Sequence, residues 1–178
     1  MEFRIALSHV DRGVERTEAV IVGRHPSETM EHLVLRVLAW CLFNEEGIAF
    51  GPGLSSADTA DLWVHDLTGR LTTWIECGTA RFEHVRRAVH QHSGAKVHAL
   101  FASERRANEF RAEISDAPHA KEASAITLWS IDPALVAALA AREERRQKWS
   151  VTIVGDHLYV DADGVNLDGA VESSPAVD

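Results

Sequence analysis

The residues DLWVHDLTGRLTTWIECG at positions 61–78 constrain the fold of this chain more than any other segment. Two segments of strand-forming residues flank a turn at Thr68-Gly69, a pattern that predicts a β-hairpin. With the turn centred there, Asp61 and Glu76 face each other across the two strands. Two like charges in this arrangement are unfavourable unless a cation or a proton lies between them. A register shift of one residue would instead place Asp61 on the other face of the sheet.

A helix is expected before the hairpin, over about residues 27–43. The sequence HPSE that begins at residue 25 is typical of a helix start, with Ser27 as the N-cap. The apolar residues that follow leave little polar face, so this helix should be central and largely buried. Glu31 shares its face with apolar residues three, four, seven and eleven positions later, which points its carboxylate to the interior. The alternative is a first-turn acid that lies against its own helix N-terminus.

The rest of the chain alternates between strand and helix patterns. Further elements are expected as strands at 3–8, 17–22, 48–50, 96–101 and 125–131, helices at 80–92 and 103–114, a helix that begins at Asp132-Pro133, and a last hairpin over 149–160. The order α-β-β-β-α-β at residues 27–101 predicts a mixed α/β or α+β fold with helices on both faces of a sheet. We expect one domain over residues 1–162 and a flexible tail over 163–178, where Gly, Asp, Ser and Pro dominate.

Composition gives the expected class and compartment. The chain has 178 residues, of which 46% are hydrophobic and 25% are charged, as in an ordinary globular protein. No apolar run approaches the ~20 residues of a membrane span, and no signal-peptide pattern is seen, so a cytoplasmic protein without membrane contact is expected. Cys41 and Cys77 are expected to be free thiols. The net charge of −9 argues against a global nucleic-acid footprint and leaves room only for a local basic groove.

The three acids predict a chemistry if they converge. Carboxylates of Glu31, Asp61 and Glu76 at one place would suit Mg²⁺ or Mn²⁺, which prefer hard oxygen ligands. Such an ion polarises a phosphodiester and generates hydroxide from its bound water. The backbone carbonyl of Cys77 would add a ligand, and Glu31 would orient a metal-bound water or hold a second ion. The simpler alternative for Asp61 and Glu76 is a solvated pair of surface acids.

Four sequence blocks resemble the YaeQ family of bacterial proteins. They are HPSET-x-E from residue 25, LAW from 38, DLWV from 61 and WIE-x-G from 74, and the resemblance covers nearly the whole chain. It implies a variation on the PD-(D/E)XK restriction-endonuclease-like nuclease fold. In that fold Glu31 would be the helix carboxylate, Asp61 the acid of the PD motif and Glu76 the acid of the E-x-K strand.

The chain departs from the nuclease motif at Gly78, where the motif has lysine. That lysine positions the attacking water and offsets charge in the transition state, a contribution of several kcal/mol in comparable roles. Arg86 and Arg87 on the following helix, or Lys96 at the start of the next strand, are candidates for a cation that has migrated. The alternative for the two arginines is a solvated helix edge.

Two histidines are weaker candidates for the same site. His25 precedes the helix start and is placed to contact a phosphate, although a structural role at the helix start is the alternative. His65 has the same parity as Asp61 on its strand.

Two functions remain open at this point. The first is a metal-dependent nuclease or phosphodiesterase that uses Glu31, Asp61 and Glu76. The second is a non-catalytic module that keeps the nuclease fold and acts through a nucleic-acid or protein partner, which Gly78 and the charge of −9 favour.

Overall fold

The computed structural model describes residues 1–178 except 53–58, 117–119 and 178. Its strands are β1 (Glu2–His9), β2 (Val14–Ile21), β3 (Ile48–Phe50), β4 (Leu62–His65), β5 (Leu71–Cys77), β6 (Lys96–Phe101), β7 (Ile126–Ile131), β8 (Arg146–Val154), β9 (His157–Ala162) and β10 (Val165–Pro175). Its helices are α1 (Met30–Leu42), α2 (Phe82–Gln91), α3 (Glu104–Ser115), α4 (Ala120–Ala123), α5 (Pro133–Ala140) and the short 3₁₀ helix η1 (Val10–Arg12).

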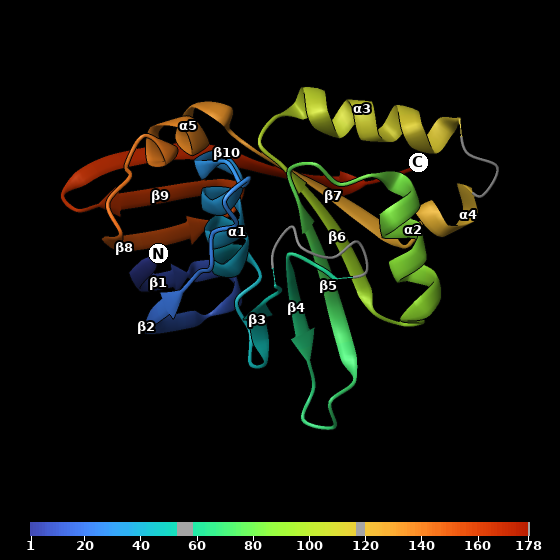
Figure 1. Ribbon diagram of the computed structural model, residues 1–178, viewed down its shortest axis with the longest axis horizontal. Helices are drawn as coiled ribbons and strands as arrows, with labels where there is room; N and C mark the ends of the chain where they lie inside the picture. The colour runs from blue at the N-terminus through green and yellow to red at the C-terminus, as the bar shows by residue number, and fades with distance from the viewer. Residues whose placement is uncertain (53–58, 117–119, 178) are drawn as a thin grey trace.

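The strands form a ten-stranded mixed sheet in the order β2-β1-β8-β9-β10-β7-β6-β5-β4-β3 (Figure 1). Most neighbours are antiparallel, and the parallel pairs are β1–β8, β5–β6 and β6–β7. The predicted mixed α+β class is confirmed. The element order α1-β3-β4-β5-α2-β6 also agrees with the order expected from the sequence.

Strand β10 joins two arms of this sheet, one made of β2, β1, β8 and β9 and the other of β7 to β3. Residues 165–170 pair with β9, and residues 171–175 pair with β7. The predicted flexible tail over 163–178 is therefore wrong for residues 165–175. Its polar, glycine-containing composition is compatible with a strand because neighbours on both sides satisfy the backbone hydrogen bonds.

One glycine of β10 lets helix α5 approach the strand closely. A Cβ atom at Gly169 would lie 2.8 Å from Cβ of Asp132 and 2.9 Å from Cβ of Leu135. We expect Gly169→Ala to destabilise the protein by about 1–3 kcal/mol, because α5 would have to move away from the sheet. Urea denaturation measures this change. Gly23→Ala is the control, because nothing lies within 4 Å of a Cβ there, and an equal effect in both variants would contradict the prediction.

Helices cover both faces of the arm formed by β7 to β3 (Figure 1). Helix α1 packs on one face, between the two arms, and α2 and α3 pack on the other. Helix α1 begins after the N-cap Thr29, whose hydroxyl accepts a hydrogen bond from the His32 backbone N–H, so the predicted cap at Ser27 is wrong. Every residue of α1 except Glu31 is buried. No helix among the described residues is long and apolar enough to cross a membrane.

The β4–β5 hairpin has the predicted register. Leu62 lies opposite Ile75, and Val64 lies opposite Thr73, before a bulge shifts the pairing at His65. Asp61 immediately precedes β4. Both cysteines are buried free thiols, as predicted.

Candidate functional site

Asp61 is buried at the start of β4, with 6% of its surface exposed. Its Oδ2 accepts a hydrogen bond of 2.8 Å from the backbone N–H of Cys77. The same oxygen lies 3.5 Å from Nε2 of His32, and Oδ1 lies 3.7 Å from Nε of Arg36. His32 and Arg36 of α1 therefore supply the positive charge beside Asp61, where the sequence predicts a metal ion.

Glu28 is a buried carboxylate that lies just before α1, with 2% of its surface exposed. Its Oε1 lies 2.6 Å from Nδ1 of His32 and 3.1 Å from Nη1 of Arg36, and its Oε2 accepts from the backbone N–H of His25. Burial by itself would raise the pKa of Glu28, but the hydrogen bonds to His32 and Arg36 hold it below its usual value. Glu28 therefore carries a negative charge inside the protein.

His32 connects Glu28 to Asp61. Its Nδ1 donates to Glu28, and its Nε2 lies 3.2 Å from the carbonyl oxygen of Cys77. Burial alone would lower the pKa of His32, but its hydrogen bonds to Asp61 and Glu28 and the two negative charges raise it to about 9. His32 is therefore an imidazolium at neutral pH.

Arg36 is the second cation, and only 1% of its surface is exposed. Besides its contacts to the two carboxylates, it donates to the carbonyl oxygens of Gly23 and Gly51. Its guanidinium also lies 5.6 Å from the ring centroid of Phe50, a cation–π distance. These contacts connect α1 to Gly23, which precedes it in the sequence, and to Phe50 and Gly51, which follow it.

Glu76 is buried beside this group, on β5. Its Oε1 accepts a hydrogen bond of 2.9 Å from Nε1 of Trp74 and lies 3.6 Å from Nδ1 of His84. Burial, followed by the negative charge of Asp61, raises the pKa of Glu76 to about 8. Its carboxyl is thus mostly protonated at neutral pH, which removes the repulsion expected between the two acids.

We call Glu28, His32, Arg36, Asp61 and Glu76 the ionic cluster. It holds two carboxylates, two cations and one protonated acid, so its charges balance internally. The sequence contains a signal for this cluster that the predictions did not use. Residues 28, 32 and 36 repeat at a four-residue spacing, with Glu28 just before the N-cap Thr29 and with His32 and Arg36 on one face of α1.

Glu31 does not lie in the ionic cluster. It is the one exposed residue of α1, so the predicted inward direction of its carboxylate is wrong. Apolar residues surround α1 on nearly every side. An acid that shares a helix face with apolar residues can therefore still face solvent. No contact found among the described residues links Glu31 to Asp61 or Glu76.

Gly78 stands where the nuclease motif has lysine, and its backbone explains why a side chain is disfavoured. Its φ is +71°, in the left-handed region, and a Cβ atom there would lie 3.0 Å from Cδ2 of His32. The Gly78 N–H donates to the carbonyl of Leu100 at 2.7 Å, which holds this conformation.

We expect Gly78→Lys to destabilise the protein. The loss should exceed the about 1–2 kcal/mol that a left-handed conformation costs an L-residue, because His32 must also move. Gly13→Lys is the control: its φ is +62°, but nothing lies within 4 Å of a Cβ. Denaturation midpoints of the two variants separate backbone strain from the His32 contact, and equal losses would contradict the prediction.

The other predicted site residues lie outside the ionic cluster. Arg86 forms an ion pair of 2.7 Å with Glu83 on α2, and Arg87 is exposed on the same helix. The Nδ1 atom of His25 lies 2.7 Å from the Ser27 hydroxyl, consistent with a role at the helix start. The ring of His65 packs against Trp63, with centroids 5.6 Å apart. Lys96 is exposed at the start of β6.

The residues present do not fit the predicted Mg²⁺ or Mn²⁺ ion in this arrangement. The Cys77 carbonyl already accepts from the Thr79 N–H at 2.8 Å and faces His32, and the Asp61 oxygens face Cys77, His32 and Arg36. A hydrated ion would have to displace both cations. In the described part of the chain, no group of three or more His, Cys, Asp and Glu side chains is arranged to hold a metal.

Comparison with known proteins places the chain in a family. The family model "YaeQ protein" matches residues 1–170. "Uncharacterized protein YaeQ" of Salmonella typhi is 28% identical over 92% of this chain and 88% of that protein, and that of Escherichia coli K12 is 27% identical over the same shares. The crystal structure of YaeQ protein from Xanthomonas axonopodis pv. citri has a TM-score of 0.84 and 25% identity, and covers 97% of this chain and 95% of that one. The corresponding values for YaeQ protein from Pseudomonas syringae are 0.81, 25%, 97% and 93%. This chain belongs to the YaeQ family.

Proposed function

We propose that this chain is a non-catalytic binding module on a variation of the PD-(D/E)XK fold. Support for the fold comes from the order α1-β3-β4-β5-α2-β6 and from the adjacency of Asp61 and Glu76 on its β4–β5 hairpin. In this proposal the two acids have become structural, and the protein acts by holding a partner.

The engagement of Asp61 is the observation that carries this proposal. In a metal-dependent nuclease this carboxylate needs oxygen lone pairs directed at an ion. Here it receives the Cys77 N–H and faces His32 and Arg36, all within 4 Å. The same two cations also neutralise Glu28. The acid is therefore part of a network that holds α1 against the hairpin.

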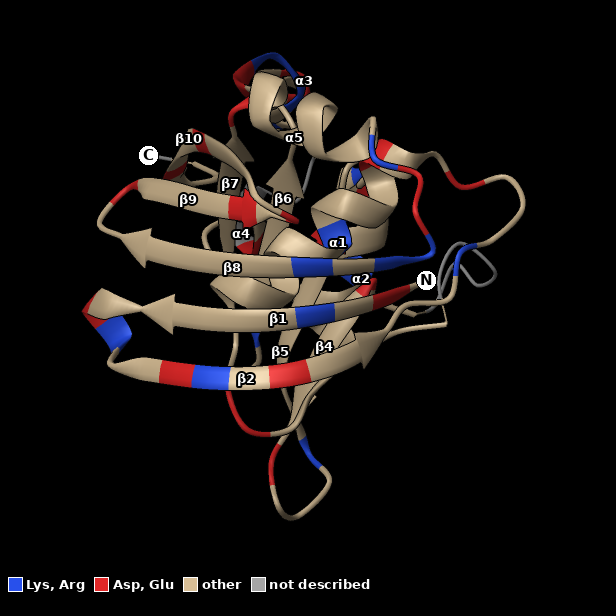
Figure 2. Cartoon of the chain, turned by 90° about the vertical axis from the view of Figure 1, so that its left-hand side faces the viewer, with Lys and Arg blue, Asp and Glu red and all other residues tan. Residues whose placement is uncertain are grey.

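The surface charges favour a protein partner over a nucleic acid. Several arginines that could line a basic groove are paired with acids on their own helices: Arg86 with Glu83, and Arg105 and Arg106 with Glu109. Basic and acidic residues are also interspersed along β1, β2 and β8 (Figure 2), and two ion pairs form there, Arg16 with Glu18 and Arg146 with Glu2. Nucleic-acid binding usually needs a continuous basic face.

A second candidate is the metal-dependent phosphodiesterase. One observation favours it: the pKa of Glu76 is raised partly by the charge of Asp61, and a divalent cation between the two acids would relieve this repulsion. It requires that His32 and Arg36 move away from Asp61.

A cleavage and binding screen separates the two candidates. The full chain is incubated with single- and double-stranded DNA and RNA in Mg²⁺ or Mn²⁺, and each ion is titrated by calorimetry. The proposal expects no cleavage and no stoichiometric ion site. Metal-dependent cleavage that is lost in Asp61→Asn and Glu76→Gln but kept in Glu31→Gln would overturn it in favour of an enzyme.

A further inference from the structure

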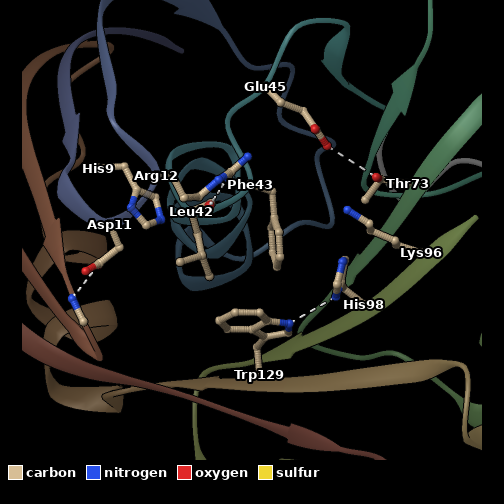
Figure 3. A pocket seen from close by; sticks show the side chains of 11 residues that line it. His9, Asp11, Arg12, Leu42, Phe43, Glu45, Thr73, Lys96, His98 and Trp129 are labelled. Atoms are coloured by element: carbon tan, nitrogen blue, oxygen red, sulfur yellow. Dashed lines mark hydrogen bonds between the residues drawn. The ribbon is translucent and has the colours of Figure 1, made fainter.

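A pocket of about 420 Å³ lies between the two arms of the sheet, at the C-terminal end of α1 (Figure 3). This volume falls within the roughly 300–1,000 Å³ of typical ligand pockets. The ionic cluster is at the other end of the helix, and a helix of 13 residues is about 20 Å long. Five separate segments contribute side chains to the pocket, including His9, Arg12, Phe43, Lys96, His98 and Trp129.

One wall of the pocket is aromatic. Phe43 stacks on the His98 ring with centroids 4.7 Å apart, and Trp129 meets Phe43 edge-on at 5.3 Å. His98 and Trp129 are only half-buried, so part of each ring faces the open space. Flat aromatic surfaces of this kind bind planar rings by stacking.

A hydrogen bond from Trp129 determines which ring nitrogen of His98 carries the proton. Its Nδ1 accepts a hydrogen bond of 3.2 Å from Nε1 of Trp129. Burial, and then the charge of Lys96, lowers the pKa of His98 to about 4, so the ring is neutral. A neutral ring that accepts at Nδ1 carries its proton on Nε2. His98 therefore offers a hydrogen-bond donor to a ligand.

Two cations face the same space without a carboxylate partner among the described residues. The side chain of Lys96 is exposed, and its ammonium makes no hydrogen bond or ion pair with any residue that the structure describes. Arg12 donates to the carbonyl oxygen of Leu42 at 3.0 Å and forms no ion pair within the described ranges. Asp11 and Glu45 also line the pocket, but their carboxylates accept hydrogen bonds from the Gly155 N–H and the Thr73 hydroxyl. The two cations are thus the charged groups of the pocket that an anionic ligand would pair with.

The pocket also contains a buried polar atom that lacks a partner. His9 is 7% exposed, and its Nδ1 has no hydrogen-bond partner in the described part of the chain. Figure 3 shows its ring beside Arg12 at the edge of the pocket. Because buried polar atoms are nearly always hydrogen-bonded in folded proteins, this atom points to a polar group on a ligand.

We propose that this pocket binds a nucleoside monophosphate, with the base against Trp129 and the phosphate between Arg12 and Lys96. The base supplies a planar ring for the aromatic wall and polar edges for His9 and His98. The phosphate supplies the negative charge that the two cations lack. This inference does not depend on the proposed function, because none of these residues belongs to the ionic cluster.

Isothermal titration calorimetry on the full chain at low salt tests the proposal. The probes are AMP, GMP, CMP and UMP, with adenosine and inorganic phosphate as half-ligands and indole-3-acetate as an aromatic carboxylate. We expect at least one nucleotide to bind with one-to-one stoichiometry, about tenfold or more tightly than either half-ligand, because ring and phosphate contacts add. Indole-3-acetate binding more tightly than all four nucleotides would overturn the phosphate assignment.

Matched lysine variants locate the site. Lys96→Gln is expected to weaken nucleotide binding about tenfold, the least that loss of a charge-assisted hydrogen bond causes. Lys148→Gln, at an exposed lysine on β8, should leave it unchanged. Trp129→Leu should also weaken binding, with circular dichroism to confirm that it folds. No binding of any nucleotide at millimolar concentration, or equal binding by Lys96→Gln and the wild type, would overturn the proposal.

Discussion

Arg36→Met is expected to destabilise the protein by about 3–5 kcal/mol, the usual cost of removing one partner from a buried ion pair. Methionine keeps much of the volume but leaves Glu28 and Asp61 with only His32 between them. The carbonyls of Gly23 and Gly51 also lose a donor. Urea denaturation with the far-UV circular dichroism signal measures the change.

Two further variants show whether this loss comes from the ionic cluster. Arg86→Met removes an arginine of the same type from an exposed ion pair on α2 and should change stability little. Combining Arg36→Met with Asp61→Asn should cost less than the sum of the two single changes, because neutralising Asp61 removes one of the charges that Arg36 balances. Strict additivity would contradict the assignment of Arg36 as the counter-charge of Asp61.

Raising the pH from about 5 to about 10 is expected to lower the free energy of unfolding by several kcal/mol, on the order of 5. His32 titrates at 6.5 when unfolded and at about 9 in the folded protein, so its contribution is complete below 6.5 and lost as pH rises through 9. Folding raises the pKa of Glu76 from 4.5 to about 8, so its contribution to stability is also lost as the pH rises. The pKa of Glu28 is lowered, so stability should also fall in acid below 4.5.

Variants that cannot titrate identify the groups responsible. Glu76→Gln keeps an acceptor for the Trp74 N–H and should flatten the decline between pH 5 and 8, where the wild type must deprotonate a buried acid. Glu31→Gln changes an exposed acid next to His32 in the sequence and should leave the decline between pH 5 and 8 in place. Denaturation curves at each pH give the profile, and a wild-type stability that rises between pH 5 and 9 would contradict the prediction.

The ionic cluster and the pocket differ in how much of each could be predicted from the sequence. For the ionic cluster, the hairpin register brought Asp61 and Glu76 together correctly, because alternation and turn residues are local signals. The sequence prediction takes Glu31 as the third acid, whereas the structure has Glu28 in the ionic cluster. For the pocket, no local pattern exists, because its residues come from segments as distant as His9 and Trp129.

Local sequence patterns were enough to predict most elements, their order and the register of the β4–β5 hairpin, since each depends on residues close together in the chain. Three features depend instead on how the elements pack. Helix α1 is buried almost all round, so the apolar residues at helical spacing from Glu31 did not show that Glu31 faces solvent. Strand β10 is ordered because β9 and β7 supply its backbone partners. The charge of Asp61 is met by His32 and Arg36, which lie far from it in sequence and come within 4 Å only when α1 packs on the hairpin.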